Sequence, residues 1–381
     1  MPPTVLQVLP NLVTGGVERG AVDIAAALTA AGWKAVVASA GGPMVRELER
    51  AGAMHVTLPL ATKNPLGIRR NGAALTRLAA EHGVSLIHAR SRAPAWSAKA
   101  AAKNCGLPFV TTFHGVYSGG LLGLKHLYNG VMASGDRVIA ISQFIADILG
   151  RDYKVPPDRI RLIHRGIDLA LFDPAKVGPQ RIVQMSQKLG LTETVPTIML
   201  PGRLTAWKGH HLLIEALAVL RSRGLVSDLR CLMVGQDQGR TAYRDSMMER
   251  TATLGVGDWV RVIEDCTDLP AAYRVSDVIV SASTRPEAFG RVVAEAQAMG
   301  RPVVAPAHGA AGEIVVSGVT GWLFTPNDAN SLADTLARAL ALTPDQRMIL
   351  AVEAMANVRE RFDKLDMCAK TLSVYGELLA S

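Results

Sequence analysis

The chain of 381 residues exceeds what one hydrophobic core usually organises, so two domains of ordinary size are expected. Hydrophobic residues make up 49% and charged residues 19%, a composition that is typical of a globular protein and excludes disorder, collagen and coiled coil. The net charge of +8 lies at the front, because residues 1–176 carry 20 Lys and Arg against 11 Asp and Glu, whereas residues 177–381 carry 21 against 22.

Short apolar segments alternate with helix-length segments along the front part of the chain. Residues 5–9 predict a strand, and residues 18–31 show apolar side chains at helical spacing. Further strands are predicted at 34–39, 55–58, 86–89, 109–112, 137–141 and 160–163. Strict alternation of strand and helix predicts right-handed crossovers and a parallel sheet covered on both faces. Residues 1–176 are therefore predicted to form a doubly wound α/β domain.

A polar stretch with Gly and Pro, from Asp173 to Pro196, is the expected linker to a second domain. The alternation then restarts, with strands predicted at 197–200, 229–234, 260–263, 278–281 and 303–305. Residues 177–363 are expected to form this second α/β domain. Residues 344–380 are predicted to be helical, and the last part, about 364–381, is expected to pack back on the first domain.

Two glycine-containing loops follow predicted strands. Gly15 and Gly16 let backbone N–H groups approach a ligand before a helix start that favours an anion, although a Gly-Gly turn by itself is more often only a tight strand-to-helix connection. Gly202, Arg203 and Lys208 follow the strand at 197–200, and two cations beside a helix start suit a diphosphate. The chain contains neither the dinucleotide turn Gly-x-Gly-x-x-Gly nor a P-loop.

Two glutamates lie beyond the strand predicted at 278–281. Glu287 and Glu295 are eight positions apart in the sequence, a span of roughly 12 Å at helical rise. Such a span matches a sugar at one end and a ribose at the other, with a diphosphate at the helix N-terminus between them. Carboxylates accept hydrogen bonds from vicinal hydroxyls, although pairs of Glu are also common on ordinary helices.

These elements resemble the retaining, GT-B-fold glycosyltransferases of family 4, also called glycosyltransferase group 1. The resemblance covers nearly the whole chain in family order, and its segments are 15–16, 113–115, 202–209, 287–304 and 313–321. It implies a GT-B fold, that is, two doubly wound Rossmann-like domains facing each other across a cleft. It also implies a donor substrate that is a UDP- or GDP-sugar.

Residue roles follow from the same resemblance. In the second domain it assigns the donor diphosphate and the leaving nucleotide to Arg203 and Lys208, beside Gly202. It assigns the ribose hydroxyls to Glu295 and the hydroxyls of the transferred sugar to Glu287.

Other donor contacts implied by the resemblance come from both domains. The backbone of Phe289 and Gly290 lies near the sugar, and Gly15 and Gly16 approach the donor from the first domain. His114 sits by the donor sugar, although a solitary His at a strand end is also a common structural residue.

The chain departs from the family pattern at two positions. Ala288 stands where Gly is common, and Arg291 stands where an apolar residue is usual. These departures leave the identity of the donor sugar open.

Three charged residues of the front part are candidate acceptor ligands. Glu18 could orient the acceptor or act as a base, and as an acid in the first helical turn it is equally explained by the helix dipole. Arg90 and Arg92 follow the strand predicted at 86–89 and are reasonable acceptor ligands or, equally, solvated charges.

The reaction implied is attack on the same face of the sugar as the leaving group, with no covalent enzyme intermediate, no cofactor and no metal. The absence of Asp-x-Asp fits this metal-independent chemistry. The expected enzyme is a hexosyltransferase that acts on a lipopolysaccharide-core or lipid-linked polysaccharide acceptor. A GT-B sugar-nucleotide epimerase is an alternative, and a basic nucleic-acid-binding protein is a second one, which the lack of a recognisable nucleic-acid motif disfavours.

The positive front part predicts either a solvated face or a polyanionic partner, such as an anionic membrane surface. The first residues lack a basic segment, and no apolar run approaches the roughly 18 residues that span a bilayer, so neither a secreted precursor nor an integral membrane protein is expected. Four cysteines lie far apart, which is typical of reduced thiols in a cytosolic protein. The expected location is cytoplasmic, peripheral on the inner face of the inner membrane.

Overall fold

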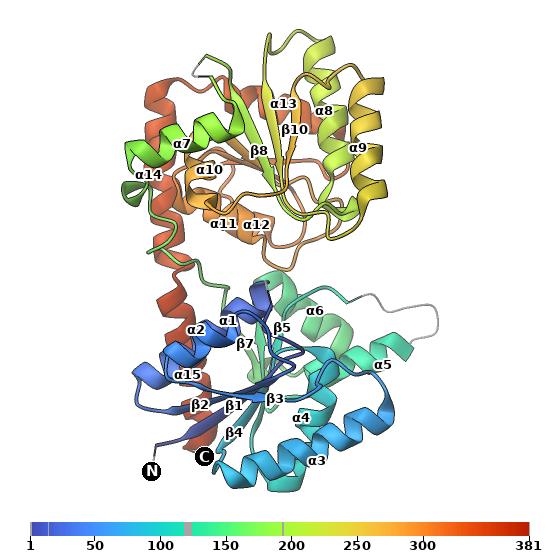
Figure 1. The fold of residues 1–381 in the computed structure, drawn as a ribbon, viewed down its shortest axis with the longest axis vertical. Helices are drawn as coiled ribbons and strands as arrows, with labels where there is room; N and C mark the ends of the chain where they lie inside the picture. Colours follow the sequence, from blue (N-terminus) through green and yellow to red (C-terminus); the bar gives the residue numbers. More distant parts are fainter. Residues whose placement is uncertain (1, 14, 118–123, 193, 381) are drawn as a thin grey trace. The chain divides into compact units, whose positions relative to one another are not determined.

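The computed structural model describes residues 2–13, 15–117, 124–192 and 194–380, which form two compact units (Figure 1). Unit 1 comprises the residues up to Gly166 together with the segment from Lys364 onward, and unit 2 runs from Ile167 to Asp363. The boundary between the two units falls at 166/167, earlier in the chain than the expected boundary at 176/177. The second boundary, where the chain returns to unit 1, falls at 363/364. The expected domains also include residues 1, 14, 118–123, 193 and 381, which lie outside the described part. A cleft between the two domains stays a prediction.

Unit 1 contains a seven-stranded parallel sheet in the order β3-β2-β1-β4-β5-β6-β7. Its strands are β1 (Thr4–Val8), β2 (Lys34–Ser39), β3 (Met54–Thr57), β4 (Leu86–Ala89), β5 (Phe109–Phe113), β6 (Arg137–Ala140) and β7 (Ile160–Leu162). Its helices are α1 (Gly16–Ala30), α2 (Val45–Arg50), α3 (Pro65–Glu81), α4 (Arg92–Cys105), α5 (Leu124–Gly130), α6 (Gln143–Tyr153) and α15 (Lys364–Leu379). Every residue of β1, β4 and β5 is buried. This is expected for strands of a parallel sheet that is covered on both faces.

Unit 2 contains a six-stranded parallel sheet in the order β10-β9-β8-β11-β12-β13. Its strands are β8 (Thr197–Pro201), β9 (Arg230–Val234), β10 (Val260–Ile263), β11 (Val278–Val280), β12 (Val303–Pro306) and β13 (Trp322–Phe324). Its helices are α7 (Pro179–Leu189), α8 (His210–Ser222), α9 (Thr241–Thr253), α10 (Leu269–Val275), α11 (Arg291–Ala298), α12 (Ala311–Ile314), α13 (Ala329–Leu340) and α14 (Pro344–Arg361). Both predicted doubly wound domains are confirmed, and β13 is a strand that the sequence patterns did not predict.

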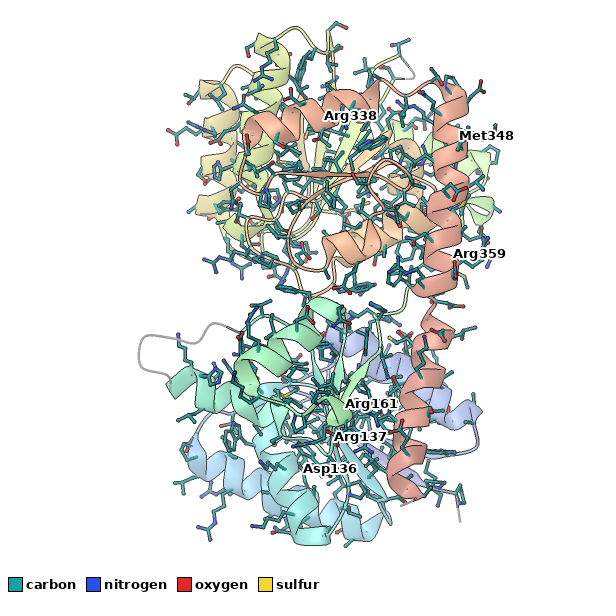
Figure 2. All side chains as sticks on the ribbon, turned by 180° about the vertical axis from the view of Figure 1, so that it is seen from behind. Asp136, Arg137, Arg161, Arg338, Met348 and Arg359 are labelled. Atoms are coloured by element: carbon teal, nitrogen blue, oxygen red, sulfur yellow. The ribbon has the colours of Figure 1, made fainter. Side chains whose placement is uncertain are left out.

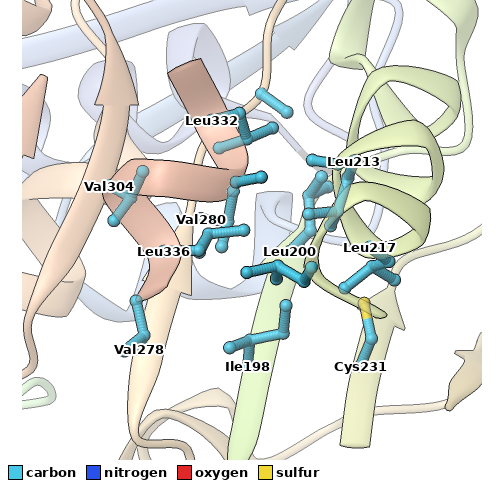
Figure 3. Close-up of a cluster of buried hydrophobic side chains, with 14 of the residues drawn as sticks. Ile198, Leu200, Leu213, Leu217, Cys231, Val278, Val280, Val304, Leu332 and Leu336 are labelled. Atoms are coloured by element: carbon cyan, nitrogen blue, oxygen red, sulfur yellow. The ribbon is translucent and has the colours of Figure 1, made fainter. Parts of the chain in front are cut away.

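A hydrophobic core lies between the sheet of unit 2 and helices α8 and α13 (Figure 3). Alternate residues of a strand share one face, so Ile198 and Leu200 of β8 lie beside Val278 and Val280 of β11. Leucines of α8 and α13 cover this face, and they are Leu213, Leu217, Leu332 and Leu336. The ends of these strands are therefore fixed points from which the following loops start.

The expected linker at 173–196 is wrong, because this stretch contains α7, which packs against α10 within unit 2. Pro179 occupies the first turn of this helix, and Gly190 ends it in the left-handed conformation. Pro at a helix start and Gly just past its end are helix boundary signals as well as loop signals. Arg181 of α7 pairs with Asp268, the N-cap residue of α10, at 2.7 Å.

The predicted C-terminal helix is interrupted between α14 and α15, and α15 packs on unit 1 as expected. Its Tyr375 is fully buried, and the phenol lies 2.6 Å from Nδ1 of His88 on β4. Its Glu377 accepts hydrogen bonds from Arg137 and Arg161, which lie on the neighbouring strands β6 and β7 (Figure 2). The last residues of the chain thus complete the core of the first domain.

No helix within the described ranges combines the length and the apolar character that a membrane span requires.

We expect Tyr375→Ala to destabilise unit 1 by about 3–5 kcal/mol, since it leaves a cavity and removes the partner of a buried His88 nitrogen. Leu365→Ala on the same helix is the control, because that side chain is 70% exposed and its loss should cost less than about 0.5 kcal/mol. Hydrogen exchange in a urea series, read by mass spectrometry, reports each unit separately. Equal effects of the two substitutions would show that α15 contributes no buried contact to unit 1.

Candidate active site

The loop after β8 packs closely against the rest of unit 2. Two glycines permit this approach, because a side chain at either position would clash. A Cβ on Gly209, whose φ is 76°, would lie 1.8 Å from the carbonyl oxygen of Ala282. A Cβ on Gly235 would lie 1.9 Å from the carbonyl oxygen of Gly202. The loop and the short helix at Ala206–Lys208 therefore lie directly beside the segment that follows β11.

Lys208 forms an ion pair with Glu287, as this close approach allows. Its Nζ lies 2.7 Å from Oε1 of Glu287, and the Ser283 hydroxyl donates to the same oxygen. The two charged side chains are only 14% and 20% exposed, so water screens the pair weakly. The ammonium group also lies 4.5 Å from the ring centroid of Trp207. Among the described residues, no group donates to Oε2 of Glu287, which leaves that oxygen ready to accept from a ligand.

Arg203 provides a second cation in the same loop. Its side chain is exposed and has no side-chain partner within the described part of the chain. Of the two predicted cations, Lys208 is thus paired with Glu287, whereas Arg203 is available to an anion.

Glu295 lies on α11 and is almost fully buried. Tyr273 donates to its Oε2 at 3.0 Å, and Arg291 donates to its Oε1 at 2.8 Å. Burial raises the pKa of Glu295, and the positive charge of Arg291 and the two hydrogen bonds act in the opposite direction. Each carboxylate oxygen keeps a further lone pair for a ligand hydroxyl. Sequence reasoning noted Arg291 only as a departure and missed Tyr273 altogether.

The spacing of roughly 12 Å expected between the two glutamates assumed helical rise along the whole span. That assumption is wrong, because α11 begins only at Arg291, after Gly290, whose φ of 87° is left-handed. Glu287 lies in the preceding loop, and Phe289 of this loop is buried against Phe362.

A small cavity lies at this edge of the unit 2 sheet. It is lined by Ser281, Glu287, Phe289, Gly290, Val293, Pro306, His308 and Ala311. Both ring nitrogens of His308 are buried and lack a hydrogen-bond partner in the described structure. His308 was missed by sequence reasoning, although it closely follows β12 in the way that Arg203 follows β8.

The glycine turn of unit 1 is covered by charged side chains. A Cβ on Gly15 would lie 2.3 Å from a carboxylate oxygen of Glu18, and one on Gly16 would lie 3.0 Å from Nη1 of Arg165. The Arg165 guanidinium donates to the carbonyl oxygen of Gly16. Gly15 and Gly16 therefore serve the packing of Glu18 and Arg165, and Arg165 is a further residue that sequence reasoning missed.

A cationic pocket lies beside this turn, and its lining includes Arg90, Thr112, His114 and Arg165. Arg90 is 4% exposed and forms no ion pair among the described residues, with Gln7 as a hydrogen-bond partner at 3.3 Å. Both ring nitrogens of His114 are buried without a partner in the described structure. Burial, with the charges of Arg165 and Arg90, holds the pKa of His114 well below its usual range. Such a pocket suits an anionic group that would complete the bonding of these side chains.

Arg92 does not line this pocket, although it follows Arg90 by two positions. Its guanidinium lies 4.3 Å from the ring centroid of Tyr117 and donates to Asn129 at 2.9 Å. Of the two arginines predicted as acceptor ligands, Arg90 lines this pocket and Arg92 packs on Tyr117.

No group of three or more His, Cys, Asp or Glu within the described residues is arranged to hold a metal ion. Independence from metal stays a prediction.

Two family models match the chain in succession. Residues 14–171 match Glycosyltransferase Family 4, and residues 182–359 match Glycosyl transferases group 1. Two doubly wound units, one with a cationic loop beside paired glutamates, define a glycosyltransferase of the GT-B fold, which confirms the predicted fold class. The chain belongs to the group 1 glycosyltransferases.

Similar proteins agree with this assignment. A glycosyltransferase from Rickettsia africae ESF-5 is 36% identical, with a TM-score of 0.91 and 99% of each chain covered. The Anabaena protein HepE, solved in complex with UDP and glucose, is 26% identical, with a TM-score of 0.85 and coverage of 99% of this chain and 100% of that one. A D-inositol 3-phosphate glycosyltransferase of Salinispora tropica is 35% identical over 258 residues, which are 66% of this chain and 52% of that protein. The chain spans about half the length of the curated relatives it matches.

We expect Gly209→Ala to lower the free energy of unfolding of unit 2 by more than about 3 kcal/mol, because the added Cβ meets the Ala282 carbonyl and the backbone is left-handed. Gly239→Ala is the matched control, since its φ is 79° and nothing lies within 4 Å of the added Cβ. It should cost about 1–2 kcal/mol, the penalty of the left-handed conformation alone. Hydrogen exchange in urea measures both costs, and equal values would contradict the close approach.

Proposed function

We propose that this chain transfers a hexose from a UDP- or GDP-hexose to a hydroxyl group of an anionic acceptor, with retention of configuration at the sugar. The observation that carries the proposal is the Lys208–Glu287 ion pair beside the cavity of unit 2, with Glu295 buried on the following helix. The neighbour solved with UDP-glucose, at 26% identity, supports a nucleotide-sugar donor.

The donor diphosphate is assigned to Arg203 and Lys208. The exposed Arg203 guanidinium can grip phosphate oxygens, and Lys208, held in place by Glu287, adds a fixed positive charge. Breakage of the bond between the sugar and the diphosphate leaves negative charge on the departing nucleotide. Cations held in place before the reaction lower the energy of that charge without a metal ion.

The hydroxyl groups of the donor are assigned to the two glutamates. Glu287 turns Oε2 to a sugar hydroxyl, since its Oε1 is already bonded to Lys208 and Ser283. Glu295 accepts from the ribose, and the hydrogen bonds from Tyr273 and Arg291 orient its carboxylate and partly offset the effect of burial, which raises its pKa. The departing phosphate then takes the proton of the attacking hydroxyl.

The acceptor is assigned to the cationic pocket of unit 1. Arg90 and Arg165 beside His114 suit a phosphate group, and relatives named D-inositol 3-phosphate glycosyltransferase support a phosphorylated polyol. The comparisons do not support the lipid-linked or lipopolysaccharide acceptor, or the peripheral membrane location, expected from the charge. The neighbours named for lipopolysaccharide biosynthesis are 20% and 13% identical and bear on the fold alone. A cytoplasmic location remains part of the proposal.

We expect a UDP- or GDP-hexose to raise the melting temperature of the protein, with EDTA present throughout because no metal is required. Arg203→Ala should weaken the binding of that donor by about 10- to 100-fold, the range for loss of a hydrogen bond to a charged group. Arg338→Ala removes an exposed cation from α13 of the same unit and should change nothing. If no nucleotide sugar stabilises the protein, or if both substitutions act alike, the donor site is wrong. Incubation with donor alone tests the epimerase alternative, which would yield a new sugar nucleotide.

We expect Arg90→Met to raise the KM for D-inositol 3-phosphate at least about tenfold, since it removes a buried cation that forms no ion pair among the described residues. Donor affinity, measured on the same variant, should stay unchanged and shows that the protein is folded. Arg92→Met is the matched control, because that guanidinium packs on Tyr117 instead. A larger effect of Arg92→Met, or equal use of inositol without phosphate, would remove the assignment of the acceptor pocket.

A further inference from the structure

We propose that His308 contacts the transferred hexose and is a determinant of donor-sugar specificity. The proposal rests on the donor site described above and adds a residue from a different strand end. Neither the motifs nor the named relatives assign a role to this position.

The backbone places His308 at the same sheet edge as Glu287. β11 and β12 are parallel neighbours, with Val280 opposite Val304, and the carboxyl ends of parallel strands meet at one edge. Glu287 lies in the segment that follows β11, and His308 follows β12. The two loops are therefore adjacent in space, although Glu287 and His308 follow different strands of the sequence.

Direct backbone contacts hold the two loops together. The N–H of Ala310 donates to the carbonyl oxygen of Glu287 at 3.0 Å, and within its own loop the N–H of His308 donates to the carbonyl oxygen of Pro306 at 2.8 Å. A Cβ on Gly309, whose φ is 61°, would lie 2.5 Å from the carbonyl oxygen of Glu287. Only glycine permits this approach, so His308 is fixed beside the loop that carries Glu287.

His308 and Glu287 line the same cavity, and the two ring nitrogens of His308 are buried with no partner in the described structure. Buried polar atoms in proteins are nearly always hydrogen-bonded, so a ring with two unpaired nitrogens indicates a missing ligand group. A neutral imidazole donates from one nitrogen and accepts at the other, and either role suits a hydroxyl.

The surroundings of His308 favour an uncharged ligand group over the diphosphate. The walls of the cavity are mainly apolar, with Phe289, Val293 and Ala311 among them, and the Glu287 charge is already balanced by Lys208, so no unpaired charge attracts an ion here. A carboxylate and an imidazole over apolar walls match a sugar ring, which presents hydroxyl edges and C–H faces. The cavity is therefore assigned to the hexose.

The first test compares UDP-glucose with UDP, or GDP-mannose with GDP if the donor panel selects guanosine, by calorimetry on the full chain. His308→Ala should weaken the hexose nucleotide about three- to tenfold, the effect of one lost hydrogen bond, and leave the bare nucleotide unchanged. His82→Ala, at the end of α3 in unit 1, is the matched control and should alter neither. Equal weakening of both ligands, or of neither, overturns the assignment.

A second test identifies the hydroxyl. The affinities of monodeoxy forms of the donor are measured for the wild type and for His308→Ala. In the wild type, one deoxy form should bind more weakly by about the same factor as the substitution costs. The variant should show no further loss of affinity with that form. Additive losses at every position overturn the contact. His308→Leu, which keeps a bulky side chain but has no hydrogen-bonding atom, replaces the alanine variant if the latter does not fold. A wild type that binds no nucleotide sugar refutes the proposed function itself, whereas normal donor binding by both variants refutes only the role of His308.

Discussion

The candidate chemistry of unit 2 depends on one constraint, the close contact of three loops at the carboxyl edge of its sheet. Parallel strands deliver the ends of β8, β11 and β12 to the same edge, and Gly209 and Gly309 let the backbone segments touch. Lys208 consequently pairs with Glu287 where little water screens the two charges, so the attraction between them is strong. With either glycine replaced, the loops would separate and the cation, the carboxylate and the imidazole would no longer share one site.

The two units handle buried charge in opposite ways. In unit 2 the buried Glu295 is balanced by Arg291 and Tyr273, so the site is internally bonded before any ligand arrives. In unit 1 the buried Arg90 has no carboxylate partner among the described residues, and His114 is left without a hydrogen bond. This difference in bonding agrees with the proposed ligands, a nucleotide sugar for unit 2 and an anionic acceptor for unit 1.

Part of the positive charge of the front part is not available at the surface. Arg90 is buried in a pocket, and Arg137 and Arg161 are paired with Glu377 of the C-terminal helix. Charge counted along a sequence measures neither exposure nor pairing, and a membrane partner inferred from it needs the surface to be free.

Local sequence determined most of the order of strands and helices, with β13 and α7 as exceptions, because apolar periodicity and Gly or Pro boundaries are properties of neighbouring residues. It also marked Lys208, Glu287 and Glu295, since each lies near a strand end or helix start. It could not separate Arg90 from Arg92, assign α7 to unit 2, or find His308. Those features depend on which strands become neighbours and which side chains lose contact with water, and only the packing of distant segments decides both.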